Sequence, residues 1–175
     1  MKIGIVGSRE YENKLKIKEF IFQLKEKFGD ELVIVSGGQK EGADGYAKKF
    51  SLGFDVKYAE FPPVHYSYNQ HCVLKRGRYG KKYYVGNFFA RNKQIAEYSE
   101  MVVGFIPEGA VSNGTRHTLS EAEKLGKKIL IQFNKSSFLV NFNKSILLKD
   151  LNERTSSFSR EVTIKFLENK NTFSG

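Results

Sequence analysis

Three short loops rich in glycine and hydroxyl residues are the parts of this sequence best suited to bind a phosphate group. Glycine lets an anion approach backbone N–H groups closely, Ser and Thr hydroxyls add donors, and arginine adds a charged planar fork. The glycine-rich fingerprints of dinucleotide-binding and P-loop proteins are both absent. We therefore predict a phosphate cleft of another design, built from Gly7, Ser8 and Arg9, from Ser36, Gly37 and Gly38, and from Ser112, Asn113, Gly114 and Thr115.

Three further side chains could complete such a cleft. Asp44 lies near the start of a predicted helix, where its carboxylate could bind ribose hydroxyls or act as a base. The alternative is a first-turn acid that interacts favourably with the helix dipole. Arg91 and Asn92 lie early in a later helix and could clamp a phosphate or ribose together with Arg9, unless Arg91 lies on an exposed helix face.

The chain has 175 residues and a net charge of +10, and most of this surplus is local. Residues 61–95 contain seven cations and no acid, with aromatic residues between them. Cations beside flat rings suit phosphates beside stacked bases. We predict a lid over an anionic ligand; the alternatives are a groove for single-stranded nucleic acid and a solvated loop. The lid residues are Lys75, Arg76, Arg78, Tyr79, Lys81, Lys82, Tyr83 and Tyr84.

The elements that must position these residues alternate along the chain. Apolar runs at 2–6, 32–35, 56–59, 101–106 and 128–133 predict strands, and helical spacing predicts helices at 17–28, 43–50, from about 87, and at 119–125. This alternation favours an α/β fold with a Rossmann-like, doubly wound and mainly parallel sheet of about five strands. Ligands bind such sheets outside the carboxyl ends of the strands, where all three loops lie.

The organisation is predicted to be one domain with an insert and a tail. Residues 1–133 form the nucleotide-binding domain, including the basic aromatic insert 61–86. Residues 134–175 contain short β-prone pieces and are predicted to be a β-rich extension packed on the same domain.

Several classes of protein do not fit the sequence. The apolar runs are shorter than the roughly 18 residues of a membrane span, and the initial run is short for a signal peptide, so we expect a cytoplasmic protein with no membrane partner. Cys72 is the single cysteine, and its spacing from His65 and His71 suits no zinc pattern. We predict no metal and no resident cofactor.

Four ordered motifs resemble a known family. They are Ile5 to Arg9, Ser36 to Gly38 with Gly42 to Asp44, Tyr79 to Lys81 running to Asn92, and Asn113 to Thr118 with Gly126 to Lys128. Together they resemble the YspA-like branch of the SLOG superfamily, which also holds the lonely-guy phosphoribohydrolases and the DNA-processing protein DprA. The resemblance covers residues 1–132. It implies a Rossmann-like fold that binds a nucleotide or nucleotide-derived ligand through the residues named above, and family analogy adds a homo-oligomer.

One departure from the family leaves enzymatic activity open. The phosphoribohydrolases carry a PGGxGTxxE motif, and alignment on Gly114 and Thr115 places Thr118 where that motif has its glutamate. A threonine cannot supply a carboxylate acid or base. Asp44 and Glu121 are the remaining catalytic candidates.

Three hypotheses follow. The first is a protein that binds a nucleotide-derived phosphate ligand as a sensor or sequestering protein. The second is a hydrolase of N-glycosidic or phosphate bonds in nucleotides. The third is a DprA-like binder of single-stranded DNA or RNA that uses Lys75 to Tyr84. We favour the first, because glycine loops at three strand ends suit a small phosphate ligand and a strand-tracking groove does not require them.

Overall fold

The fold is built on one twisted sheet. The computed structural model describes residues 1–63, 85–110 and 112–133, together with the backbone of residues 137–140. Within these ranges, the strands are β1 (Lys2–Gly7), β2 (Val33–Ser36), β3 (Lys57–Glu60), β4 (Met101–Phe105), β5 (Lys128–Gln132) and β6 (Ser137–Val140). Their order is β3-β2-β1-β4-β5-β6, and the first five are parallel while β6 runs antiparallel to β5. The predicted doubly wound α/β fold is confirmed.

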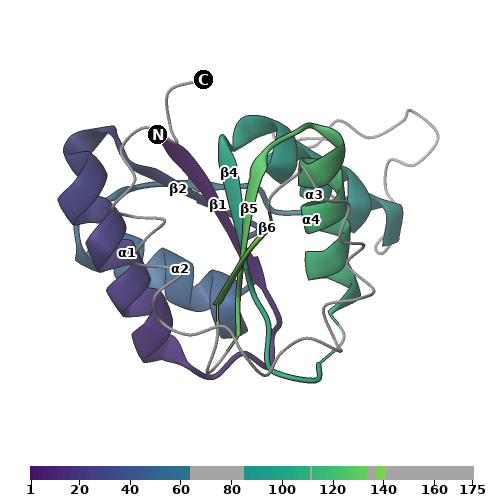
Figure 1. Cartoon of the computed structure of the whole chain (residues 1–175), viewed down its shortest axis with the longest axis horizontal. Helices are drawn as coiled ribbons and strands as arrows, with labels where there is room; N and C mark the ends of the chain where they lie inside the picture. Colours follow the sequence, from purple (N-terminus) through teal and green to yellow (C-terminus); the bar gives the residue numbers. More distant parts are fainter. Residues whose placement is uncertain (64–84, 111, 134–136, 141–175) are drawn as a thin grey trace.

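Two pairs of helices sandwich the sheet. Helices α1 (Lys14–Phe28) and α2 (Gly42–Gly53) cover one face, and α3 (Val85–Tyr98) and α4 (Asn113–Lys124) cover the other (Figure 1). The chain winds outward from β1 to β3 on one side and from β4 to β5 on the other. The direction of winding therefore reverses between β1 and β4, which is where ligands bind in folds of this type.

The sheet separates two apolar cores, because successive side chains along a strand point to opposite faces of the sheet. Ile3 and Ile5 of β1 belong to the core under α1 and α2, whereas Val102 and Ile129 belong to the core under α3 and α4. Because β4 is buried along its whole length, its sequence is a continuous apolar run. This double burial is why the strands were visible in the sequence.

Helix ends were less predictable than strands. Helix α3 begins at Val85, close to the expected start near residue 87. Helix α4 begins at Asn113, six residues before the first apolar position of the expected helix, because its first turn is polar and carries no periodic signal. Among the described helices, none is long and apolar enough to cross a membrane.

Parts of the sequence predictions lie outside the described residues. These are residues 64–84 of the basic aromatic insert, which contain every predicted lid residue, and residues 134–136 and 141–175 of the tail. Of the tail, the structure places residues 137–140 at the edge of the sheet, where β6 pairs with β5. The boundaries of the domain, its insert and its extension stay predictions.

Candidate functional site

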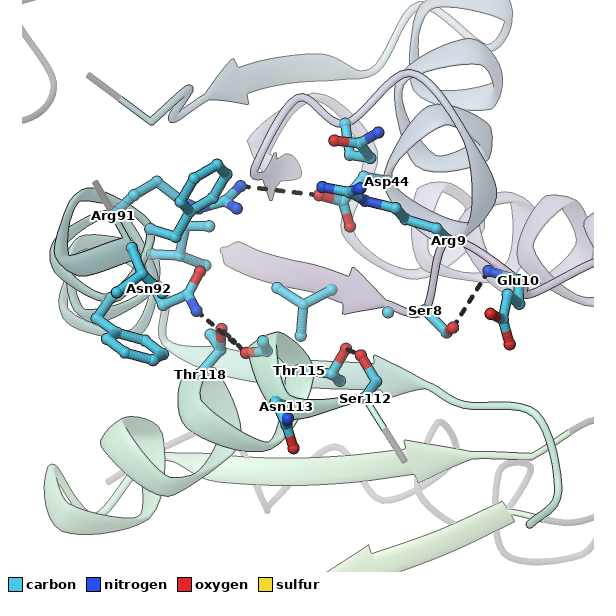
Figure 2. A pocket seen from close by; sticks show the side chains of 18 residues that line it. Ser8, Arg9, Glu10, Asp44, Arg91, Asn92, Ser112, Asn113, Thr115 and Thr118 are labelled. Carbon is cyan, nitrogen blue, oxygen red and sulfur yellow. Dashed lines mark hydrogen bonds and ion pairs between the residues drawn. The ribbon is translucent and has the colours of Figure 1, made fainter. Parts of the chain in front are cut away.

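A pocket of about 500 Å³ opens at the carboxyl ends of β1 and β4, within the size range typical of small-ligand sites. Its walls come from the loop after β1, the loop before α2 with the start of α2, one face of α3, and the start of α4 (Figure 2). The structure brings most of the predicted binding residues together here. Those on its wall are Gly7, Ser8, Arg9, Asp44, Arg91, Asn92, Ser112, Asn113, Gly114 and Thr115.

The start of α4 forms one side of the pocket. The first intrahelical bond runs from Arg116 N–H to the Ser112 carbonyl, so the N–H groups of residues 113–115 precede it and have no intrahelical acceptor. The Ser112 and Thr115 hydroxyls lie 2.8 Å apart across this turn. With the positive end of the helix dipole, these donors make the turn suited to an anion.

Helix α3 holds the α4 turn in place. The Asn92 side-chain amide and the Thr118 hydroxyl both donate to the Gly114 carbonyl, each at 3.1 Å. Asn92 is buried, and its contact joins the two helices at the pocket wall. Thr118, which stands where the phosphoribohydrolase motif has a glutamate, therefore acts here as a donor to backbone in addition to lining the pocket.

A buried ion pair forms the opposite side of the pocket (Figure 2). Asp44 is only 7% exposed, and its Oδ2 lies 4.0 Å from Nη1 of Arg91. Burial raises the pKa of Asp44 to about 6, although the Arg91 guanidinium and the backbone N–H groups of Gln39, Gly37 and Gly7 lower it. The Arg91 guanidinium carbon lies 5.8 Å from the ring centroid of Phe88, which also lines the pocket.

The stretch Ser36 to Gly38, where β2 ends and its loop begins, supports this pair and does not line the pocket, whereas Gln39 further along the same loop does. The Ser36 hydroxyl lies 2.8 Å from the Tyr58 hydroxyl and accepts a bond from Gly38 N–H at 3.3 Å. A Cβ atom on Gly37 would lie 1.4 Å from Nη1 of Arg91. Gly37 therefore leaves the space that the Arg91 guanidinium occupies beside Asp44. Three predicted binding residues are therefore absent from the pocket wall and lie next to it: Ser36, Gly37 and Gly38.

The loop after β1 is fixed by its own backbone. Ser8 N–H donates to the Phe105 carbonyl at 3.0 Å, and the Ser8 carbonyl accepts from the N–H groups of Tyr11 and Ala43, each at 3.2 Å. The Ser8 hydroxyl accepts from Glu10 N–H at 3.1 Å. These bonds hold the loop between β4 and α2, and Arg9 projects from it as an exposed cation on the pocket wall.

Glu121 lies away from the pocket wall. Its Oε1 atom pairs with Nζ of Lys124 at 2.6 Å, and the residue is absent from the pocket lining. His117 also lies behind the wall, with its ring stacked on Phe89 at a centroid distance of 4.5 Å, and burial lowers its pKa. Of the two catalytic candidates from the sequence, Asp44 is the one that the structure places at the pocket.

The described part of the chain contains no group of three or more His, Cys, Asp or Glu side chains that could hold a metal ion.

Comparison with known proteins identifies the fold. The chain is similar to the molybdenum cofactor binding protein from the phototrophic bacterium Rippkaea orientalis, with a TM-score of 0.58 and 17% identity over 95% of this chain and 94% of that one. It is also similar to the molybdenum cofactor carrier protein from Chlamydomonas reinhardtii, with a TM-score of 0.51 and 18% identity over 74% of each chain. The fold is shared. No protein-family model and no curated protein matches the chain.

Some wall residues were absent from the sequence predictions. Phe88 could have been found, because it precedes Arg91 and Asn92 by three and four positions and so shares their helix face. Its apolar character instead favours a core position. Glu10 and Gln39 lie in irregular loops and carry no periodic signal. The remaining wall residues outside the predicted binding set are Val6, Val85, Phe89, Ile95 and Thr118.

Proposed function

We propose that this protein binds a small phosphorylated ligand that carries a flat ring system, and holds it as a carrier or sensor. The observation that supports this most strongly is the first turn of α4, which presents free N–H groups and hydroxyls to a pocket at the point where the sheet reverses its winding. Phe88 and Phe89 on the facing helix supply aromatic surface within the same pocket.

The molybdenum cofactor is the first ligand to test within this class. The two similar structures are described as proteins that bind or carry that cofactor. It is a pterin with a phosphate group, so it combines the two features that the pocket suits. In this proposal the molybdenum cofactor is a ligand that the protein carries. Nucleotides and their derivatives are the wider class of ligands that the pocket would accept. The homo-oligomer, the cytoplasmic location and the lid at residues 75–84 remain parts of the proposal.

The test is calorimetric titration of the full chain with isolated molybdenum cofactor, GMP and ADP-ribose. We expect at least one of them to bind, and we expect Arg9→Ala to weaken that binding by about tenfold or more, since hydrogen bonds to charged groups contribute about 1.5–3 kcal/mol. Arg116→Ala is the matched control, because Arg116 follows the same turn of α4 but is absent from the pocket wall. Failure of all three ligands to bind, or equal loss in both variants, would contradict the proposal.

One observation favours a hydrolase as the second candidate. The pKa of Asp44 is raised to about 6, near the pH at which a general acid or base works best. Incubation of the protein with nucleoside monophosphates, followed by chromatography, tests this role. Product formation that disappears in Asp44→Asn would support hydrolysis, whereas unchanged substrate would exclude it for these compounds.

A further inference from the structure

We propose that the bound ligand points its phosphate away from Asp44 and places a neutral hydroxyl or amino group against the Asp44 carboxylate. This inference rests on the proposed function and adds the ligand's orientation and the chemistry of its second contact. It makes Asp44 a residue that selects ligands by their hydrogen-bond donors.

The two sides of the pocket present different polar groups to a ligand. Figure 2 shows Asp44 and Arg91 on one side of the β1 terminus, and Ser112, Asn113 and Thr115 on the other. The α4 side offers backbone N–H groups and hydroxyls, which suit an anion. On the Asp44 side a buried carboxylate is paired with Arg91. A phosphate in direct contact with this carboxylate would be repelled, whereas a neutral donor can form a hydrogen bond to it.

Asp44 retains capacity to accept a donor from a ligand. The 4.0 Å separation of Oδ2 from Arg91 Nη1 exceeds hydrogen-bond length, and a carboxylate has about four acceptor positions. Burial raises its pKa even though Arg91 and three backbone N–H groups lower it, so the protein alone does not fully compensate the buried charge. The other titratable side chain that interacts with Asp44 is Tyr58 of β3, whose own pKa is raised by burial.

The surroundings of Asp44 also suit the organic part of a ligand. Phe88 lies under the Arg91 guanidinium at 5.8 Å and lines the same pocket. A ring or sugar that packs against Phe88 would bring its polar edge toward the carboxylate. Sugar hydroxyls and amino groups of a base or pterin share the required chemistry, so the experiment must separate these two sources.

The experiment measures the affinity of the wild-type full chain for GMP, 2′-deoxy-GMP and IMP by calorimetry. All three carry the same phosphate; 2′-deoxy-GMP lacks one sugar hydroxyl, and IMP lacks the ring amino group. GMP also shares its 2-amino-4-oxopyrimidine edge with a pterin. We expect one of the two analogues to bind about 10- to 100-fold more weakly than GMP, and the weaker analogue identifies the group that contacts Asp44.

Substitutions of Asp44 then test whether this residue causes the difference in affinity between GMP and its weaker analogue. We expect Asp44→Asn and Asp44→Ser each to reduce the difference between GMP and the weaker analogue to less than about threefold. Glu41→Gln is the matched control, because Glu41 is an exposed carboxylate three residues earlier that does not line the pocket, and it should retain the full difference. Circular dichroism establishes that each variant is folded, and two substitutions guard against the misfolding of one.

The outcomes separate this inference from the proposed function. Equal binding of all three nucleotides to the wild type would overturn the inference and leave the phosphate site standing. A difference in affinity between GMP and the weaker analogue that persists in folded Asp44 variants would also overturn it. Another residue would then form the hydrogen bond with the ligand's donor group. If GMP, ADP-ribose and the molybdenum cofactor all fail to bind, the proposed function fails, and the inference fails with it.

Discussion

The loop after β2 and the loop before α4 are similar in sequence but differ in their structural tasks. Both combine serine with glycine at the carboxyl edge of the sheet. The loop after β2 is covered by Arg91, and its serine is fully buried against Tyr58. The loop before α4 faces the cavity. The difference teaches that glycine can serve a ligand site indirectly, by making room for a charged side chain that lines it.

Strand order explains the difference between the two loops. The loop before α4 follows β4, which lies next to β1 where the winding reverses. The chain leaves these two strands toward opposite faces of the sheet, so a crevice opens between them. The loop after β2 leads to α2, which packs on the same face as α1, and no reversal occurs there (Figure 1).

The largest expected effect concerns the Asp44 and Arg91 pair that the β2 loop supports. The folded-state pKa of Asp44, about 6, lies above its ordinary value of 3.8, so the folded protein holds this proton more tightly than the unfolded chain. The stabilisation from that proton is present below about pH 4 and is lost as pH rises through 6. We expect the free energy of unfolding of the wild type, relative to Asp44→Asn, to fall by roughly 2 kcal/mol between pH 4 and pH 7.

The free energy of unfolding of the wild type and of Asp44→Asn is measured by urea denaturation between pH 4 and pH 7. Neither Arg91 nor Tyr58, which interact with Asp44, changes charge within this range, because the arginine stays protonated and burial raises the tyrosine pKa. Parallel pH profiles of the two proteins would show that Asp44 is not desolvated as described.

The second effect concerns Gly37 and sharpens the role of the β2 loop. The Cβ atom in Gly37→Ala would overlap the Arg91 guanidinium, so we expect a loss of about 1–2 kcal/mol in the free energy of unfolding. In an Arg91→Ala background the same substitution should cost less, because the severe overlap with Arg91 is absent and only the 2.9 Å approach to Asp44 Oδ2 remains. Equal costs in the two backgrounds, measured by urea denaturation, would refute the supporting role of Gly37.

The third effect concerns Gly114 and tests the open character of the α4 loop. A Cβ atom there would meet nothing within 4 Å, and the residue lies in the first turn of the helix. We expect Gly114→Ala to raise the free energy of unfolding by about 0.5 kcal/mol, since alanine restricts the unfolded chain more than glycine does. A clear loss of stability by thermal melting would show that this loop is as tightly covered as the β2 loop.

The smallest expected effect concerns Glu121, the catalytic candidate that lies outside the pocket. We expect Glu121→Gln to leave the affinity for any bound nucleotide within twofold of the wild-type value. Its pair with the exposed Lys124 contributes less than about 1 kcal/mol to stability. A loss of affinity comparable to that of Arg9→Ala, measured by the same calorimetric titration, would show that Glu121 contributes to ligand binding.

Most of the fold was predictable because burial on both faces makes the inner strands of the sheet continuous apolar runs. Residues 2–6 and 101–106 were recognised for this reason, and their structural bounds differ from the prediction by a single residue. The polar start of α4 was missed, since a first turn that faces a cavity has no apolar period. Most of the site followed from one rule, that polar loops at the carboxyl ends of parallel strands converge at one edge of the sheet.

The sequence by itself determined the α/β class, the three glycine loops and the presence of Arg9, Asp44, Arg91 and Asn92 near a common edge. The tertiary structure alone decided which loops face the cavity and which one lies beneath Arg91. It also decided that Asp44 is buried beside Arg91 while Glu121 pairs with Lys124 away from the pocket. The physical reason is that two features decide which side chains meet at this edge: the order of the strands in the sheet and the face of the sheet on which each helix packs. The alternation of strands and helices along the chain specifies neither feature.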